Sequence, residues 1–254
     1  MKLKFLGTGG VLGTPVWNCN CKACTSEDAR NVRMRPSFLV QLANTNIIID
    51  FGKDFHQQVL KYSLPHIDFA FLTHAHQDHI GGFEQFSSNG KCIVTMPTSV
   101  FNDFWKDSSA DWITARNPEM LLSAFQGVRK IENFSISPVK LNHNKDFSPN
   151  YVPAYGYVFR SDDFSFAYLG DHDKVLEPEK LENLDLLITD GNRWEDNGWG
   201  HAGIAGGLKE YEKYKPKRMI FTHLSHDIEH NDAQWHVRQI GNIDIAYDGM
   251  EVEF

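Results

Sequence analysis

Hydrophobic residues along the chain recur with two different spacings, and each spacing predicts a different kind of element. Residues 2–7, 37–43 and 46–51 are short apolar or alternating runs typical of β-strands. Residues 54–62 instead place their hydrophobic positions at helical spacing. The run 67–73 is almost continuously apolar, which is typical of a strand covered on both faces. The first part of the chain therefore predicts strands with helices between them.

The same two patterns continue to the C-terminus. We predict helices that start at His79 and cover about 203–214 and 230–239, and further strands over 134–143, 154–161, 164–171, 184–190, 218–226 and 243–250. The aromatic-rich stretch 98–126 is also expected to be helical, with local packing favoured over a substrate lid. Sheets with helices outside them indicate an α+β protein built as a four-layer αββα sandwich. We expect residues 1–254 to form one such domain.

Composition and charge narrow the class of protein. The 254 residues are 41% hydrophobic and 23% charged, as in ordinary globular proteins, and the formal net charge of -8 argues against a nucleic-acid surface spread over the whole molecule. No apolar run approaches the roughly 20 residues that span a bilayer. The N-terminus also lacks the long apolar stretch of a secretory signal. We therefore expect a cytoplasmic protein that does not act in a membrane, and the charge disfavours nucleic acid as a partner while leaving a local basic patch open.

The stretch FLTHAHQDHIGG, residues 71–82, crowds histidines and an aspartate directly after the apolar run. Such side chains are costly to bring together unless something binds them. His74 and His76 are two apart in an extended segment, so their side chains point the same way. Asp78 and His79 are adjacent at a helix start and point elsewhere. This segment therefore predicts ligands for two neighbouring metal ions rather than one.

Further polar residues stand at the ends of other predicted strands. His143, Asp171, Asp190 and His223 each end or follow such a strand. Residues at the ends of several strands can converge on one edge of a packed core. Imidazoles and carboxylates together suit Zn, Mn, Fe or Ni, and the two oxygens of Asp171 could bridge two ions. We expect all of these side chains to meet at one site.

These residues resemble the signature of the metallo-β-lactamase superfamily, which is His-x-His-x-Asp-His after a strand, then a distant His, Asp and His. The resemblance implies an αββα fold with two divalent metal ions. It implies a first metal on His74, His76 and His143, a second on Asp78, His79 and His223, and Asp171 as the bridge. An aspartate where some members carry a cysteine is similar to the phosphodiesterase and hydrolase branches. The resemblance therefore favours a hydrolase that acts on phosphodiesters.

Three of the four cysteines, Cys19, Cys21 and Cys24, lie together near the N-terminus. Clustered cysteines in a reducing compartment are more often metal ligands than disulfides, and a closed structural zinc site needs four ligands. His226, three residues after His223, is the best fourth ligand. The alternative is three free thiols without a metal. The remaining Cys92 is expected to be an inert thiol in a buried strand.

A narrower resemblance is to the cyclic phosphodiesterases of bacterial phosphonate breakdown. The shared features are the glycine-rich start with its cysteine cluster, LNH at 141–143, THLSH at 222–226 and DGME at 248–251. This resemblance implies hydrolysis of 5-phosphoribosyl 1,2-cyclic phosphate to ribose 1,5-bisphosphate, with two Mn or Zn ions beside one structural Zn. Related enzymes often form dimers, so a homodimer is an open expectation. The sequence departs from the family around 171–174 and 190–203, which leaves the exact substrate open.

The expected chemistry is attack on phosphorus by hydroxide. Two metal ions close together make hydroxide near neutral pH by lowering the pKa of a shared water molecule. We expect His201 to give a proton to the leaving alkoxide, and Asp190 to orient His201 or touch a metal-bound ligand. The alternative for His201 is a helix cap or a surface residue, and the alternative for Asp190 is a strand-end cap. Asp78 is placed in the catalytic set as well as among the ligands, and Asp50 is expected to hydrogen-bond a ligand histidine.

Four other residues are candidates for contact with substrate phosphate, and two other functions are alternatives to a phosphodiesterase. His172 is a possible contact to substrate phosphate, and Arg33, Arg35 and Arg193 are possible phosphate clamps. One rival function is a tRNA 3′-processing nuclease, which the absence of a Lys/Arg-rich insertion disfavours. Another rival is a non-catalytic carrier or binding protein on this fold, which the intact ligand set disfavours. The expected partner is a small phosphodiester.

Overall fold

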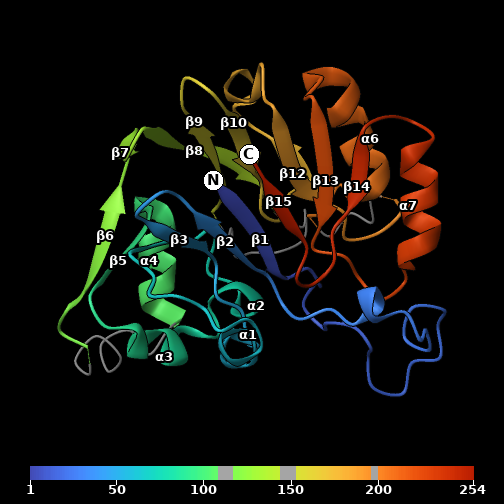
Figure 1. Ribbon diagram of the computed structural model, residues 1–254, viewed down its shortest axis with the longest axis horizontal. Helices are drawn as coiled ribbons and strands as arrows, with labels where there is room; N and C mark the ends of the chain where they lie inside the picture. The colour runs from blue at the N-terminus through green and yellow to red at the C-terminus, as the bar shows by residue number, and fades with distance from the viewer. Residues whose placement is uncertain (108–116, 144–152, 196–199) are drawn as a thin grey trace.

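The chain folds into two β-sheets that pack face to face, with helices on both outer faces (Figure 1). The computed structural model describes residues 1–254 except 108–116, 144–152 and 196–199. Within the described residues, the first sheet has the strand order β15-β1-β2-β3-β4-β5-β6. The second has the order β11-β8-β9-β10-β12-β13-β14, and β7 pairs with β8. The predicted four-layer αββα sandwich is confirmed.

The strands of the first sheet are β1 (Lys2–Gly7), β2 (Ser37–Gln41), β3 (Asn46–Ile49), β4 (Phe69–Phe71), β5 (Cys92–Pro97), β6 (Met120–Phe125) and β15 (Glu251–Glu253). Those of the second are β7 (Arg129–Ile131), β8 (Phe134–Asn142), β9 (Ala154–Arg160), β10 (Ser165–Tyr168), β11 (Lys174–Val175), β12 (Leu186–Asp190), β13 (Arg218–Thr222) and β14 (Ile243–Ile245). The helices are α1 (Phe55–Tyr62), α2 (Gln77–Ile80), α3 (Phe83–Phe86), α4 (Thr98–Asp107), α6 (Gly203–Tyr214) and α7 (His230–Arg238).

Three hydrophobic cores fill the spaces between the four layers. In β3, Ile47 and Ile49 face the core between the sheets, while Ile48 faces the core beneath the helices of the first sheet. This alternation follows from the period of two along a strand. A third core joins the outer face of the second sheet to α6 and α7, where Phe221 and Val237 pack together. None of the helices in the described ranges has the length and hydrophobicity of a membrane span.

The predicted elements differ from the structure in a few places. Of the helix predicted over 98–126, Thr98–Asp107 forms α4, residues 108–116 lie outside the described residues, and Met120–Phe125 forms strand β6 instead. This strand pairs in parallel with β5 at the edge of the first sheet, and its tertiary partner overrides local propensity. The strand predicted over 243–250 ends at Ile245, and the chain then crosses to the first sheet as β15. The strands β7 and β11 were not predicted. Trp112, one of the aromatic residues of 98–126, lies outside the described residues.

Strand direction gathers the carboxyl ends of both sheets at one edge of the sandwich. The strands β3, β4 and β5 are parallel to one another, as are β10, β12 and β13. The strand β8 runs antiparallel to β9, and β9 runs antiparallel to β10, so β8 ends at the same edge as β10. Clefts outside the carboxyl ends of parallel strands are where α/β proteins commonly build their sites.

Candidate metal centre

The ends of four strands place ligand-type side chains at this edge. His74 follows β4, and His143 comes directly after β8. Asp171 follows β10, and His223 comes directly after β13. All four side chains are buried. Three overlapping groups of ligand-type side chains result, and in each the ligand atoms lie within 4.8 Å of one another. The third group adds Asp190 and His201 to members of the other two.

The first group consists of His74, His76, His143 and Asp171. The Nδ1 atom of His76 lies 3.0 Å from Nε2 of His74 and 3.2 Å from Nε2 of His143. The Asp171 Oδ2 atom is 3.8 Å from Nε2 of His74 and 3.8 Å from Nε2 of His143. Three imidazole nitrogens and one carboxylate oxygen therefore point at a common space.

The second group consists of Asp78, His79, Asp171 and His223. The same Asp171 Oδ2 atom lies 3.3 Å from Nε2 of His79 and 3.3 Å from Nε2 of His223. The Asp78 Oδ2 atom is 3.7 Å from Nε2 of His79 and 3.5 Å from Nε2 of His223. Asp171 belongs to both groups, so these residues could hold two cations that share one carboxylate.

The chemistry of these side chains fits bound cations. His79 Nε2 and Asp171 Oδ1 are buried and have no hydrogen-bond partner among the described residues. Buried polar atoms are rarely left without a partner, so each exception needs an explanation. Burial lowers the pKa of His74 far below its usual value, and burial lowers that of His143 to about 4. These two imidazoles are thus neutral at physiological pH, which is the form that binds a metal ion.

Neighbouring groups fix which nitrogen of each imidazole faces the site. The Nδ1–H of His79 donates to Asp50 Oδ2 at 2.7 Å, as predicted for Asp50. Thr73 Oγ1 donates to the same Asp50 oxygen at 2.8 Å and lies 3.0 Å from Nδ1 of His74. Since that hydroxyl proton is already donated, Thr73 is left to accept the Nδ1–H of His74. In both histidines Nε2 is therefore the nitrogen that faces the centre.

A main-chain carbonyl plays the same part for His143. Its Nδ1–H donates to the Gly200 carbonyl oxygen at 2.7 Å, in a segment 57 residues away along the chain. Gly200 has a φ of 82°, in the left-handed region that favours glycine. No side-chain pattern marks a carbonyl contact of this kind, so it could not be predicted from the sequence.

His201 and Asp190 form a hydrogen-bonded pair beside the two groups. The Nδ1 atom of His201 lies 2.5 Å from Asp190 Oδ2, and its ring centroid is 4.9 Å from that of His143 and 5.2 Å from that of His223. Burial opposes a charge on His201, but the Asp190 carboxylate outweighs this and raises the pKa of His201 to about 9. The His201 side chain is 15% exposed, whereas that of Asp190 is fully buried. The structure thus places an imidazole whose pKa is raised by its carboxylate partner at the solvent side of the centre.

Asn192 is a further neighbour that the sequence analysis missed. Its backbone N–H donates to Asp190 Oδ1 at 2.7 Å, and its Nδ2 atom lies 3.2 Å from both Nδ1 and the carbonyl oxygen of His223. A Cβ on Gly10 would lie 2.9 Å from that Nδ2, so the glycine lets the N-terminal loop approach. The only signal in the sequence was the position of Asn192 two residues after a strand-end aspartate.

The three clustered cysteines meet His226 at the outer side of this edge. The Sγ atoms of Cys19 and Cys21 lie 3.3 Å and 3.4 Å from Nδ1 of His226, and the ligand atoms of all four residues lie within 4.8 Å of one another. Hydrogen bonds from its neighbours outweigh burial and lower the pKa of the Cys21 thiol to about 6. Three sulfurs and one imidazole nitrogen match the donor set of a structural zinc site.

The structure also sorts the residues considered for phosphate binding. Arg33 is fully buried and donates to the carbonyl oxygens of Ser225 and Ile228, so it is not a phosphate clamp. Arg35 is paired with Asp54 at 3.1 Å. Arg193 remains exposed.

His172 corrects another expectation. Its side chain is fully buried, and both ring nitrogens are occupied by protein acceptors, the Gly170 carbonyl and the Glu210 carboxylate. The expectation that this imidazole contacts substrate phosphate is therefore wrong.

Comparison with known proteins adds independent findings. A family model described as the beta-lactamase superfamily domain matches residues 45–224. The crystal structure of a new diphosphatase from the PhnP family superposes with a TM-score of 0.84 at 29% identity, covering 100% of this chain and 97% of that one. Residues 45–224 include every member of the three groups that contain Asp171, but not the cysteine cluster.

Two curated relatives are more distant. The octanoyltransferase of Porphyromonas gingivalis is 26% identical over an alignment of 267 positions that covers 99% of this chain but 51% of the relative, so the chain spans about half its length. The coenzyme PQQ synthesis protein B of Cupriavidus necator is 23% identical over 309 residues, covering 98% of both chains. The similarity thus extends over nearly the whole chain.

Proposed function

Since the chain belongs to the beta-lactamase superfamily and is a metal-dependent hydrolase, we propose that it is a phosphodiesterase acting on a small cyclic phosphate. The proposed substrate is 5-phosphoribosyl 1,2-cyclic phosphate, and the proposed product is ribose 1,5-bisphosphate. The observation that carries this proposal is the pair of donor groups that share Asp171, with His201 beside them. Oxygen-rich phosphodiesters are the substrates that such paired sites suit.

Seven residues would hold the two cations, with Mn or Zn as the proposed ions. They are His74, His76 and His143 for one ion, Asp78, His79 and His223 for the other, and Asp171 for both. Two bound divalent ions would lower the pKa of a water molecule and offset negative charge on phosphate oxygens. Cys19, Cys21, Cys24 and His226 would hold one structural Zn.

The chain's own residues would handle the proton that the leaving oxygen needs. The Asp190 carboxylate holds the Nδ1 side of His201, so the imidazole presents its Nε2–H toward the open side of the centre. A histidine kept protonated by a buried carboxylate is suited to general acid catalysis. Asp190 would therefore act through His201. A role for His201 as a helix cap, or for Asp190 as a strand-end cap, would not require this contact between the two side chains.

The test is turnover of the cyclic phosphate by the metal-loaded protein. We expect hydrolysis of 5-phosphoribosyl 1,2-cyclic phosphate to be faster than that of 2′,3′-cyclic nucleotides and of bis-p-nitrophenyl phosphate. His201→Ala should keep both metal ions and lose roughly 10²–10⁴-fold in kcat. His66→Ala, which removes an exposed histidine of the same type, is the matched control. An active His201→Ala variant would remove His201 from the mechanism, and a fully loaded wild type that cleaves no phosphodiester would refute the proposal.

A second candidate function is cleavage of a phosphoanhydride. It is favoured by one observation, the 29% identity over the whole chain to a protein described as a diphosphatase. The same paired cations and proton donor would serve that reaction, because it too displaces an oxygen from phosphorus. Parallel assays of the cyclic phosphate and of a sugar or nucleoside diphosphate would decide between them by the ratio of kcat/KM. The homodimer and the cytoplasmic location stay predictions.

A further inference from the structure

His172, the residue after Asp171, carries a buried ion pair that the proposed mechanism does not use. Its Nδ1 donates to the Gly170 carbonyl at 2.9 Å, and its Nε2 donates to Glu210 Oε1 at 3.0 Å. Both acceptors lie on the protein side, so the ring does not face the metal centre. A buried ion pair costs desolvation of two charges, so its presence here needs a reason beyond packing.

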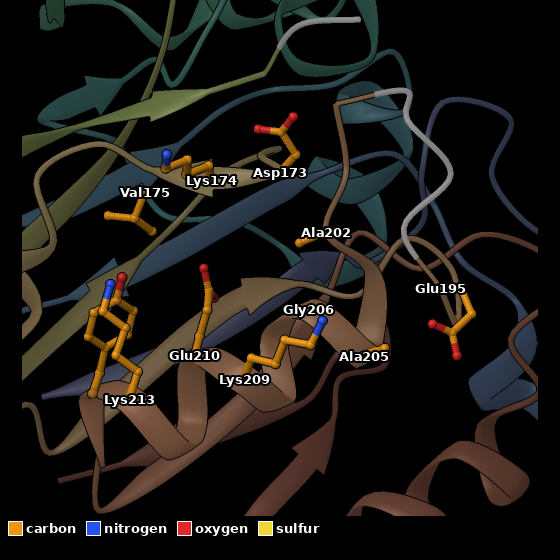
Figure 2. A pocket seen from close by; sticks show the side chains of 11 residues that line it. Asp173, Lys174, Val175, Glu195, Ala202, Ala205, Gly206, Lys209, Glu210 and Lys213 are labelled. Atoms are coloured by element: carbon orange, nitrogen blue, oxygen red, sulfur yellow. The ribbon is translucent and has the colours of Figure 1, made fainter.

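Glu210 turns toward the interior although cations lie near it on the surface. It lines a cavity of about 300 Å³, together with Lys174, Lys209 and Lys213 (Figure 2). Among the described residues, none of these lysines forms an ion pair with it. Its second oxygen instead accepts from Thr189 Oγ1 at 2.9 Å. Both carboxylate oxygens are therefore committed to groups that lie toward the second sheet.

The main chain of His172 links three functional segments. Its N–H donates to Asp190 Oδ2 at 3.3 Å, and its carbonyl accepts from Ala202 N at 2.7 Å. Asp190 is the hydrogen-bond partner of His201, and Ala202 is the residue after His201. One residue thus touches the segments that carry the shared carboxylate, the proton donor and the partner of that donor.

From these contacts we infer that Glu210 and His172 are a positioning pair for the metal centre, an inference that rests on the two-metal site proposed above. The pair anchors the segment Gly170–His172 to α6. Asp171 is the middle residue of this segment, so the position of its side chain depends on the same contact. Removing one partner leaves a buried charge unpaired and lets the turn shift. A misplacement of about 1 Å at a reacting group can cost on the order of 100-fold in rate.

The test is Glu210→Gln, with Glu212→Gln as the matched control on the exposed side of the same helix. The two variants and the wild type are titrated with MnCl₂, and free Mn(II) is followed by its EPR signal. Glu210→Gln should bind Mn(II) at least about 10-fold more weakly, since neighbours of metal ligands typically contribute 10–100-fold. Its kcat should fall while KM for the phosphodiester stays within about twofold. Glu212→Gln should match the wild type in both measurements.

A structural role alone would lower the melting temperature without changing metal affinity well below it. The double variant His172→Gln/Glu210→Gln removes both charges and tests the pair even if Glu210→Gln folds poorly. It too should bind Mn(II) more weakly, with the cysteine-bound zinc retained. Wild-type Mn(II) affinity and kcat in the folded variants would overturn the inference. A wild type without phosphodiester turnover, but with the loss of affinity in Glu210→Gln, would instead overturn only the proposed function.

Discussion

Replacing Asp50 with asparagine probes how the centre fixes its ligands, because the shape stays the same and only the charge and one acceptor are lost. Asp50 is fully buried and accepts three hydrogen bonds, from Thr73 N at 2.8 Å, Thr73 Oγ1 at 2.8 Å and His79 Nδ1 at 2.7 Å. An asparagine has one acceptor oxygen and one NH₂ group in these places. If the oxygen keeps the backbone N–H, the NH₂ faces His79.

That exchange changes the tautomer of His79. An NH₂ group donates to Nδ1, so the proton moves to Nε2, the atom that faces Asp171 and is otherwise unpaired. A protonated Nε2 cannot bind a cation. We therefore expect Asp50→Asn to bind the second metal ion about 10–100-fold more weakly, which is about 1.4–2.7 kcal/mol.

The assay is calorimetric titration of metal-depleted protein with Zn(II) and Mn(II) well below the melting temperature. Asp68→Asn is the control, since Asp68 accepts from the backbone N–H of Asn46 and lies away from the centre. The control should match the wild type, and Asp50→Asn should lose affinity in one of its two active-centre binding steps. Equal affinity in Asp50→Asn and wild type would refute the tautomer argument.

Three other predictions test separate parts of the molecule. The kcat of the metal-loaded protein should fall as pH rises, because His201 must carry a proton to act as an acid. The pKa of His201 is about 9 without cations and lower with them, so kcat should fall at or below pH 9. A pH–rate profile of Asp190→Asn should show this fall at lower pH than in the wild type. An unshifted fall would contradict this assignment. Cys21→Ser should lose one equivalent of zinc by elemental analysis while the other two metal ions remain, and retention of all three would contradict a zinc site there. Tyr157→Phe should reduce the free energy of unfolding, measured in urea, by about 1 kcal/mol, because the buried Tyr157 hydroxyl donates to the Leu72 carbonyl at 2.5 Å. An unchanged free energy of unfolding would show that this hydrogen bond does not stabilise the fold.

The grouping of the ligand-type residues could be predicted from the sequence because each one stands beside a strand whose pattern is clear. His143 and His223 directly follow strands with strong alternating or continuous apolar character, and both strands, β8 and β13, end at the same edge of the second sheet. The four-layer architecture follows from the same strands and from the helices between them.

The missed features depend on partners that are far away in the sequence. The Gly200 carbonyl and the Glu210 carboxylate orient residues 57 and 38 positions away, and neither contact leaves a local pattern. The strand β6 was taken for a helix because its aromatic and aliphatic residues suit both states, and only its pairing with β5 decides. His172 was misjudged because adjacency to Asp171 says nothing about which way the ring points.

The central claim is that side chains from both sheets hold two cations that share Asp171. It is tested most directly by anomalous diffraction from crystals grown with manganese. We predict two manganese peaks on either side of the Asp171 carboxylate, roughly 3.5–4 Å apart as in other paired sites. A single peak, or none, with the imidazoles of the two donor groups turned away from Asp171 would contradict it.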